Sequence, residues 1–390
     1  MGEQHSAFWG QSEEAPVPIG LASRPPDPPR DNGHDPKQRE VTGSGPPPGI
    51  EPTAPRSPAQ DVSAFRDDYL LRARAQAPQQ GWRKVLHQAS LGLLNLGPSP
   101  AELARRQLEA EAKSAIPGCR RIAVISRKGG VGKTTTTLML GHSFAGLRGD
   151  RVVALDGNPD AGSLGYRVTR QTPATVTDLL TEADSIARYS DVRAFTSQAP
   201  SRLEVVASDD DPRISQALIE GDYARVVDVL ERHYNLILLD TGTGILDSAT
   251  RGILSLADQL VVVMAPSLDG ARAASLTLDW LDEHGHGALT RSAVAVINAV
   301  RSHNGLLELG RVAEHFELRC RAVVEIPWDA QLEAGAESAL DDLARPTRDA
   351  YLGLAAAVAD GFGDSAPRQP PRTSVSDDRL ERKERKAVQR

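Results

Sequence analysis

One short stretch of the chain combines two lysines, three glycines and a run of threonines at a spacing suited to phosphate chemistry. Closely spaced glycines let backbone N–H groups turn inward and approach an anion. The second lysine is placed to reach the β- and γ-phosphates of a nucleotide, and the hydroxyl after it is placed to bind Mg²⁺. The predicted ligands are therefore the phosphates of a nucleotide and Mg²⁺. The loop residues predicted to bind them are Gly129, Gly130, Val131, Gly132, Lys133, Thr134 and Thr135.

The segments on either side of this loop are the elements that must position it. Residues 122–125 form a short apolar run typical of a buried strand. Residues 134–147 carry apolar side chains at roughly helical spacing, which predicts a helix. The start of that helix adds its positive dipole end to the loop. Strand, glycine loop and helix together predict a phosphate site, and the alternative is a glycine-rich turn before an ordinary helix.

Short apolar runs and helical patterns alternate from there to residue 362. Continuous apolar strands joined by helices indicate an α/β fold with a doubly wound, mostly parallel sheet and helices on both faces, as in a P-loop NTPase. The predicted strands are residues 122–125, 152–155, 203–207, 236–239, 260–265, 293–297 and 322–326. The predicted helices are residues 134–147, 175–182, 222–234, 269–283, 306–316 and 347–362.

An aspartate follows the fully apolar strand 236–239. Ligands of a doubly wound sheet bind at the carboxyl ends of its strands, so Asp240 is expected beside the glycine loop. An acid in that position holds Mg²⁺, usually through water. With Thr134, Asp240 is a predicted metal-binding residue, although a lone aspartate after an apolar run is more often part of a turn.

The loop resembles that of the deviant Walker A ATPases of the ParA/MinD family, which reads KGGxGK[TS]. The resemblance covers residues 119–362. It implies that Lys128, the early lysine, reaches across a dimer to the partner's nucleotide. The alternative for Lys128 is a solvated loop cation.

The same resemblance gives a role to the residues after the second strand. Asp156 matches the first acid of the family's Asp-x-Asp element and is implied to support the metal and the loop. The second acid, implied to position the attacking water, is Asn158 here. An amide can orient water, since phosphoryl transfer depends mostly on positioning and charge stabilisation. Asp160 is the alternative for this role, and an Asx-rich turn is the structural alternative for the whole stretch.

Two later sites are implied to flank the adenine. Asn298 follows the strand 293–297, and its amide suits the donor and acceptor edge of adenine. Pro327 and Trp328 follow the last strand. The alternatives are a capping or turn role for Asn298 and a packing role for Trp328.

The ends of the chain differ in composition from its middle. Residues 1–80 are predicted to be a disordered proline-rich arm, since 13 of the 27 prolines lie in the first 60 residues. Residues 81–117 are predicted to be a helical linker or docking segment. Its first apolar face, residues 82–94, is expected to pack on the ATPase body or to bind a protein partner, with a membrane surface as the third possibility. Residues 118–362 form the predicted ATPase domain, and residues 363–390 a polar tail.

Charge and composition limit the possible partners. Residues 121–362 carry 23 basic and 33 acidic side chains, so DNA binding is unlikely but stays open through local patches and the tail. No apolar run of 18 residues occurs, so no integral membrane segment is expected. The two cysteines are too few for a disulfide framework. The protein is expected in the cytoplasm, and at the membrane only through a partner.

The extensions and the stretch SRKGGVGKTTTT…ALDGNPDAGSLG resemble a narrower group, the actinobacterial EspI-like ATPases associated with type VII (ESX) secretion. The expected function is an ATP-hydrolysing, nucleotide-switched homodimer that serves or regulates such a secretion system. Its protein partner is expected to bind through residues 1–117. The alternatives are a ParA-type ATPase that partitions DNA or cargo, and a regulatory adaptor that binds ATP but barely hydrolyses it.

Overall fold

The computed structural model describes residues 81–91, 93–159, 162–244, 247–301 and 307–363, except for the side chain of Trp82. The predicted arm 1–80, nearly all of the predicted tail and the candidate Asp160 lie outside these residues.

An eight-stranded sheet forms the centre of the molecule, with the strand order β3-β4-β2-β5-β1-β6-β7-β8. All neighbouring strands pair in parallel except β3 and β4. Their side chains form near-continuous apolar runs because both faces of the sheet are covered. The strands are β1 (Arg120–Ile125), β2 (Val152–Gly157), β3 (Ser197–Gln198), β4 (Glu204–Val206), β5 (Leu236–Thr241), β6 (Gln259–Met264), β7 (Val294–Val300) and β8 (Ala322–Pro327).

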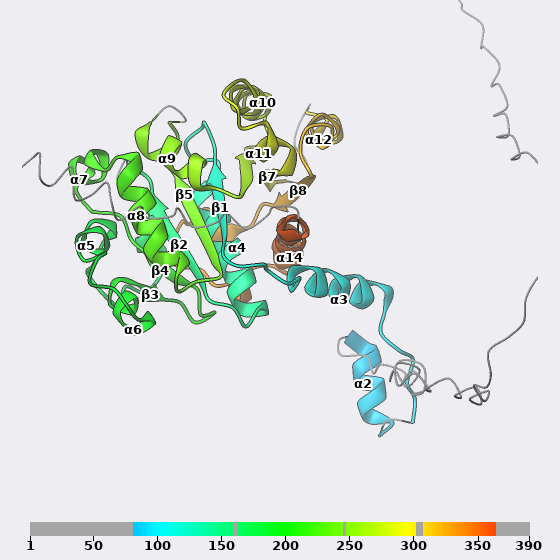
Figure 1. Cartoon of the computed structure of the whole chain (residues 1–390). Helices are drawn as coiled ribbons and strands as arrows, with labels where there is room; N and C mark the ends of the chain where they lie inside the picture. The colour runs from blue at the N-terminus through cyan, green and yellow to red at the C-terminus, as the bar shows by residue number, and fades with distance from the viewer. Residues whose placement is uncertain (1–80, 92, 160–161, 245–246, 302–306, 364–390) are drawn as a thin grey trace, which may run out of the picture. The chain divides into compact units, whose positions relative to one another are not determined.

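Helices cover both faces of this sheet (Figure 1). Helices α4 (Lys133–Leu147) and α14 (Arg345–Asp360) pack on one face, and α8 (Glu220–Glu231), α9 (Ser248–Leu256) and α10 (Leu268–Glu283) pack on the other. The remaining helices are α2 (Gly81–Ala89), α3 (Pro100–Ala112), α5 (Val176–Thr181), α6 (Tyr189–Val192), α7 (Pro212–Ala217), α11 (Gly287–Ser292), α12 (Leu309–Glu317) and α13 (Ala330–Glu333), with short 3-10 turns such as η2 (Leu164–Arg167).

The α/β fold expected from the sequence is confirmed, and each predicted strand is present within a few residues. The helix α9 was not predicted, and its central Gly252 is a residue of low helix propensity. In the structure this glycine lies against α8, where an added Cβ would be 2.8 Å from the Cα of Glu220. Close packing of two helices explains a residue that the local pattern disfavours.

In the segment before the first strand, α3 packs on the body of the domain, whereas the apolar side chains in and after α2 stay exposed. Helix α3 packs on α14 and α4, and the Arg148 side chain donates hydrogen bonds to the carbonyls of Ala112 (2.7 Å) and Ser114 (2.8 Å). Helix α2 ends at Ala89, earlier than the predicted 82–94, and the backbone leaves the helical region at Leu91, which has a φ of +51°. Five apolar side chains in and after α2 are exposed, so the expected packing on the ATPase body is not seen for them: Val85, Leu91, Leu93, Leu94 and Leu96. None of the helices in the described part of the chain combines the length and apolar character that a membrane crossing requires.

A buried ion pair fixes the amino end of the central strand β1. The Arg121 guanidinium donates to both carboxylate oxygens of Asp258, each at 3.0 Å, and also contacts Glu231 at 3.1 Å. The two strands β1 and β6 thereby start in register. This pair lies at the opposite end of β1 from the glycine loop, roughly 15 Å away at the usual rise per residue.

We predict that Asp258→Ala lowers the free energy of unfolding by about 3 kcal/mol, because it leaves the Arg121 charge buried with fewer partners. The matched control is Asp184→Ala, which removes the exposed pair with Arg225 and should change stability by less than about 1 kcal/mol. Urea unfolding of the two variants measures both values. Equal losses would contradict a special role for the buried pair.

Candidate nucleotide-binding site

The glycine loop connects β1 to α4 and requires glycine at two positions. Gly130 and Gly132 have φ angles of +74° and +89°, which favour glycine. A Cβ on Gly132 would also lie 2.0 Å from the amide nitrogen of Asn298. That nitrogen donates a hydrogen bond to the Val131 carbonyl at 2.8 Å. The loop is therefore held from strand β7, and its backbone can curve around an anion.

Lys133 is the first residue of α4, and its side chain is buried. The Nζ atom lies 3.3 Å from Oδ1 of Asp240 and donates to the Thr241 carbonyl. Both partners belong to the carboxyl end of β5, which neighbours β1. The predicted phosphate-binding lysine thus lies at the point where the loop, the helix start and β5 meet.

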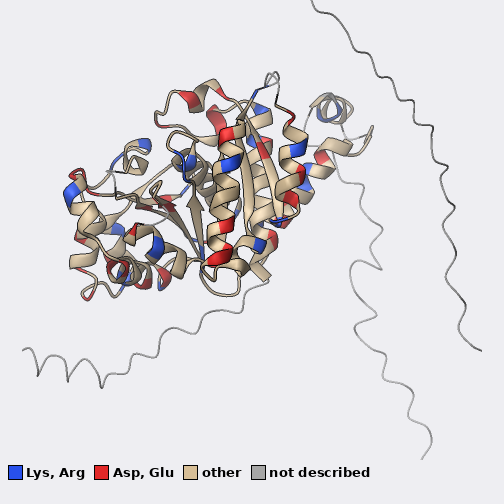
Figure 2. Cartoon of the chain, turned by 90° about the horizontal axis from the view of Figure 1, so that it is seen from above, with Lys and Arg blue, Asp and Glu red and all other residues tan. Residues whose placement is uncertain are grey.

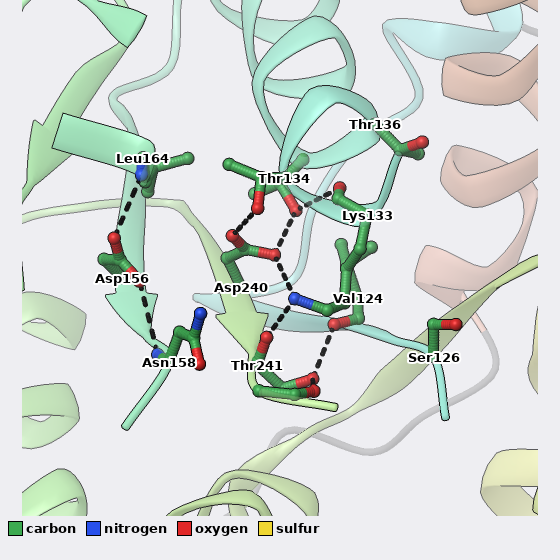
Figure 3. Close-up of polar contacts among 12 residues, drawn as sticks. Val124, Ser126, Lys133, Thr134, Thr136, Asp156, Asn158, Leu164, Asp240 and Thr241 are labelled. Atoms are coloured by element: carbon green, nitrogen blue, oxygen red, sulfur yellow. Dashed lines mark hydrogen bonds and ion pairs between the residues drawn. The ribbon is translucent and has the colours of Figure 1, made fainter. Parts of the chain in front are cut away.

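Asp240 is fully buried, and its carboxylate accepts hydrogen bonds from hydroxyl groups at the start of α4 (Figure 3). The Thr134 hydroxyl donates to Oδ2 at 2.6 Å, and the Thr137 hydroxyl lies 3.2 Å from Oδ1. The sequence predicted Thr134 and Asp240 as a metal-binding pair, and the structure brings their oxygens together. Thr137 was not predicted, although its position three residues after Thr134 puts it on the same helix face.

Asp156 lies beside Asp240 across the pairing of β2 with β5. Its oxygens accept hydrogen bonds from the backbone amides of Asn158 (3.2 Å) and Leu164 (3.0 Å) and from the Ser208 hydroxyl (3.3 Å). Burial, together with the nearby charge of Asp240, raises the pKa of Asp156 above its usual range. Asp156 therefore organises the segment that follows β2, and Asn158 comes to lie at the same edge of the sheet (Figure 3).

Lys128 points away from this buried cluster. It forms an ion pair with Asp269, in the first turn of α10, and its side chain is 41% exposed while that of Asp269 is 74% exposed. A pair this exposed is weakly held and can exchange partners. The predicted cross-subunit lysine is therefore accessible from outside the molecule.

A cavity of about 370 Å³ opens beside the glycine loop. Its walls include the two predicted adenine sites, Asn298 and the pair Pro327 and Trp328. The guanidinium of Arg301 lies 4.7 Å from the centre of the Trp328 ring. Asn298 was expected after its strand, but β7 continues to Val300 across a register shift. The residues that line this cavity are Gly130, Val131, Gly132, Thr135, Arg167, Ala265, Pro266, Asn298, Ala299, Arg301, Pro327, Trp328, Asp329, Leu332, Glu333 and Gly335.

These residues fit a magnesium nucleotide. The glycine loop, in which Gly130 and Gly132 have positive φ angles, can turn backbone N–H groups toward a phosphate. Lys133 brings a buried positive charge, and the oxygens of Thr134 and Asp240 are of the kind that Mg²⁺ prefers. The adjoining cavity has room for a nucleoside.

Comparison with known proteins agrees with this geometry. A family model described as an AAA domain matches residues 119–286. Two solved structures share the fold, each with a TM-score of 0.50: a ParA family ATPase from Chlorobium tepidum (16% identity, 63% of this chain and 98% of that one) and the cell division ATPase MinD from Pyrococcus furiosus (21% identity, 61% and 98%). The chain therefore contains a domain with the fold of these two ATPases.

A more similar relative is the ESX-1 secretion-associated protein EspI of Mycobacterium tuberculosis. It is 40% identical over 286 residues, which make up 73% of this chain and 42% of EspI. This chain thus spans about two fifths of the length of that relative. The resemblance to EspI-like proteins that the sequence suggested is confirmed.

We predict that Lys133→Ala lowers the affinity for Mg-ATP at least about tenfold, because it removes the buried charge that faces the phosphates. Titration calorimetry measures the loss. The control is Lys113→Ala, which changes an exposed lysine at the end of α3 and should leave the affinity unchanged. Tight binding by the Lys133 variant would contradict the assignment of the phosphate loop.

Proposed function

We propose that this protein binds and hydrolyses ATP with Mg²⁺ and acts as a nucleotide-switched homodimer. The observation that carries the proposal is the convergence of Lys133, Thr134 and Asp240 at the carboxyl ends of β1 and β5. Three residue types with separate roles in phosphate chemistry meet there within hydrogen-bond distance. A structural turn would not require a buried lysine opposite a buried aspartate.

Each residue of the site has a separate task in this proposal. The loop amides and the start of α4 bind the phosphates, and Lys133 stabilises their negative charge. Thr134 and Asp240 would hold Mg²⁺, and a bound Mg²⁺ would neutralise part of the negative charge on the phosphates. Asp156 keeps the segment after β2 folded against the site through its hydrogen bonds to backbone amides.

Asn158 is the residue proposed to position the attacking water. Its backbone amide is fixed by Asp156, which holds the residue at the carboxyl edge of the sheet. A neutral amide orients water without acting as a base, so the proposed hydrolysis is slow. The ATP-bound state then persists, which suits a switch. A regulatory adaptor with little turnover is the second candidate function, and the same asparagine favours it.

The proposed dimer depends on Lys128. This residue is exposed next to the phosphate loop, and its ion pair with Asp269 lies at the surface. Exchange of Asp269 for the phosphates of a partner's nucleotide would join two copies only when ATP is bound. Each subunit would then complete the site of the other.

A role in type VII secretion follows by extension from EspI, whose name associates it with ESX-1 secretion. The exposed apolar side chains around α2 supply a surface for the proposed protein partner, within the predicted segment 1–117. Acidic and basic positions are interspersed along the helices seen in Figure 2, which does not favour binding to DNA phosphates. We place the protein in the cytoplasm, at the membrane only through its partner.

We predict that Lys128→Ala binds ATP as a monomer, while the wild type becomes dimeric with ATP. Light scattering with and without nucleotide measures the difference. Asp269→Asn is the matched control, since it breaks the same intrachain ion pair but keeps the lysine, and it should still dimerise. If wild type and the Lys128 variant give the same mass with ATP, the cross-subunit role is wrong.

We predict that Asn158→Asp speeds single-turnover hydrolysis, because a carboxylate polarises water better than an amide within hydrogen-bond reach. Asp160→Ala is the comparison, since Asp160 is the other candidate for this task. If Asp160 positions the water, its loss abolishes turnover and Asn158→Asp changes little. Unchanged rates in both variants, with ATP affinity intact, would remove this segment from the chemistry.

A further inference from the structure

One cationic side chain in the wall of the cavity has no place in the functions derived above. Arg167 ends the turn η2, which follows the segment organised by Asp156. Its Nη1 donates to the Thr135 hydroxyl at 2.9 Å, and Thr135 lies in the first turn of α4. The side chain therefore lies beside the phosphate loop, on the same cavity as Asn298 and Trp328.

Arg167 is near enough to Asp240 to be attracted by its charge, but within the described part of the chain it touches no carboxylate. Among the described residues it forms no ion pair, and its Nε atom is buried without a hydrogen-bond partner. Burial lowers the pKa of this guanidinium below its ordinary value. Arg121 differs, because it is buried and contacts both Asp258 and Glu231, whereas Arg167 is half-buried and its described partner is a neutral hydroxyl. A partly enclosed cation with a buried, unpartnered N–H group favours an anion that completes the site.

The position of Arg167 limits which anion can do so. The phosphate loop with Lys133 forms one end of the cavity region, and Asn298 and Trp328 belong to the proposed base site. Arg167 and Thr135 lie on the wall that both regions share. We infer that Arg167 binds the phosphate of the nucleotide that is nearest the nucleoside. This inference rests on the proposed nucleotide function and adds a residue that no sequence motif singled out.

The inference separates Arg167 from a residue that only braces the fold. If it only braced the fold, its loss would lower stability and affect ligands with and without a phosphate alike. If it binds the phosphate, its loss matters only for ligands that carry one. Adenosine and AMP differ by that single group, and ATP and ADP share it.

The experiment measures the affinities of Arg167→Gln for adenosine, AMP, ADP and ATP by ligand-observed NMR and calorimetry. The control is Arg170→Gln, which removes a nearby arginine that does not line the cavity and is paired with Asp210 at 3.7 Å. We expect the preference for AMP over adenosine to fall about tenfold in the Arg167 variant and to stay unchanged in the control. The affinities for ATP and ADP should fall by the same factor as each other.

Thermal unfolding without nucleotide checks that the Arg167→Gln variant is folded. If that variant does not fold, Arg167→Met takes its place, since methionine keeps much of the aliphatic chain. Failure of the wild type to bind ATP would overturn the proposed function itself. ATP binding by the wild type together with an unchanged preference for AMP over adenosine in the variant would overturn only the role of Arg167. Equal losses for adenosine and AMP would show a structural role and likewise overturn it.

Discussion

The site depends on the burial of two opposite charges, Lys133 and Asp240, at the ends of neighbouring strands. A buried charge is tolerated only where partners surround it. Asp240 obtains its partners from one turn of helix, since Thr134 and Thr137 both donate to it and Lys133 lies 3.3 Å away. Helix α4 must therefore begin where it does, and the glycine loop must span the distance from β1 to that point.

The loop is also held from the opposite side of β1. Strands β6 and β7 continue the sheet there, and Asn298 of β7 reaches back to the Val131 carbonyl. Gly132 has no side chain that could prevent this approach. The loop thus lies between a charged contact from β5 and an amide contact from β7, and its shape is determined by the sheet as much as by its own glycines.

Sequence patterns predicted the features that depend on neighbours along the chain. The strand, loop and helix around Lys133 were predicted from spacing, and Asp240 from its place after an apolar strand. Features that depend on folding could not be predicted in this way. The hydrogen bond of Asn298 to the loop, the ion pair of Lys128 with a helix 141 residues later and the place of Arg167 in the cavity wall arise only when distant segments meet. No local pattern marks such residues, because their types are common on ordinary surfaces.

Helix α4 has a second attachment at its far end. There, the Arg148 side chain donates hydrogen bonds to the carbonyls of Ala112, the last residue of α3, and of Ser114, which follows it. A helix of this length is a stiff rod of roughly 22 Å. Tension applied to the chain ahead of α3 would act on one end of this rod, while the phosphate loop forms the other end. A single continuous helix thus connects the end of α3 to the glycine loop.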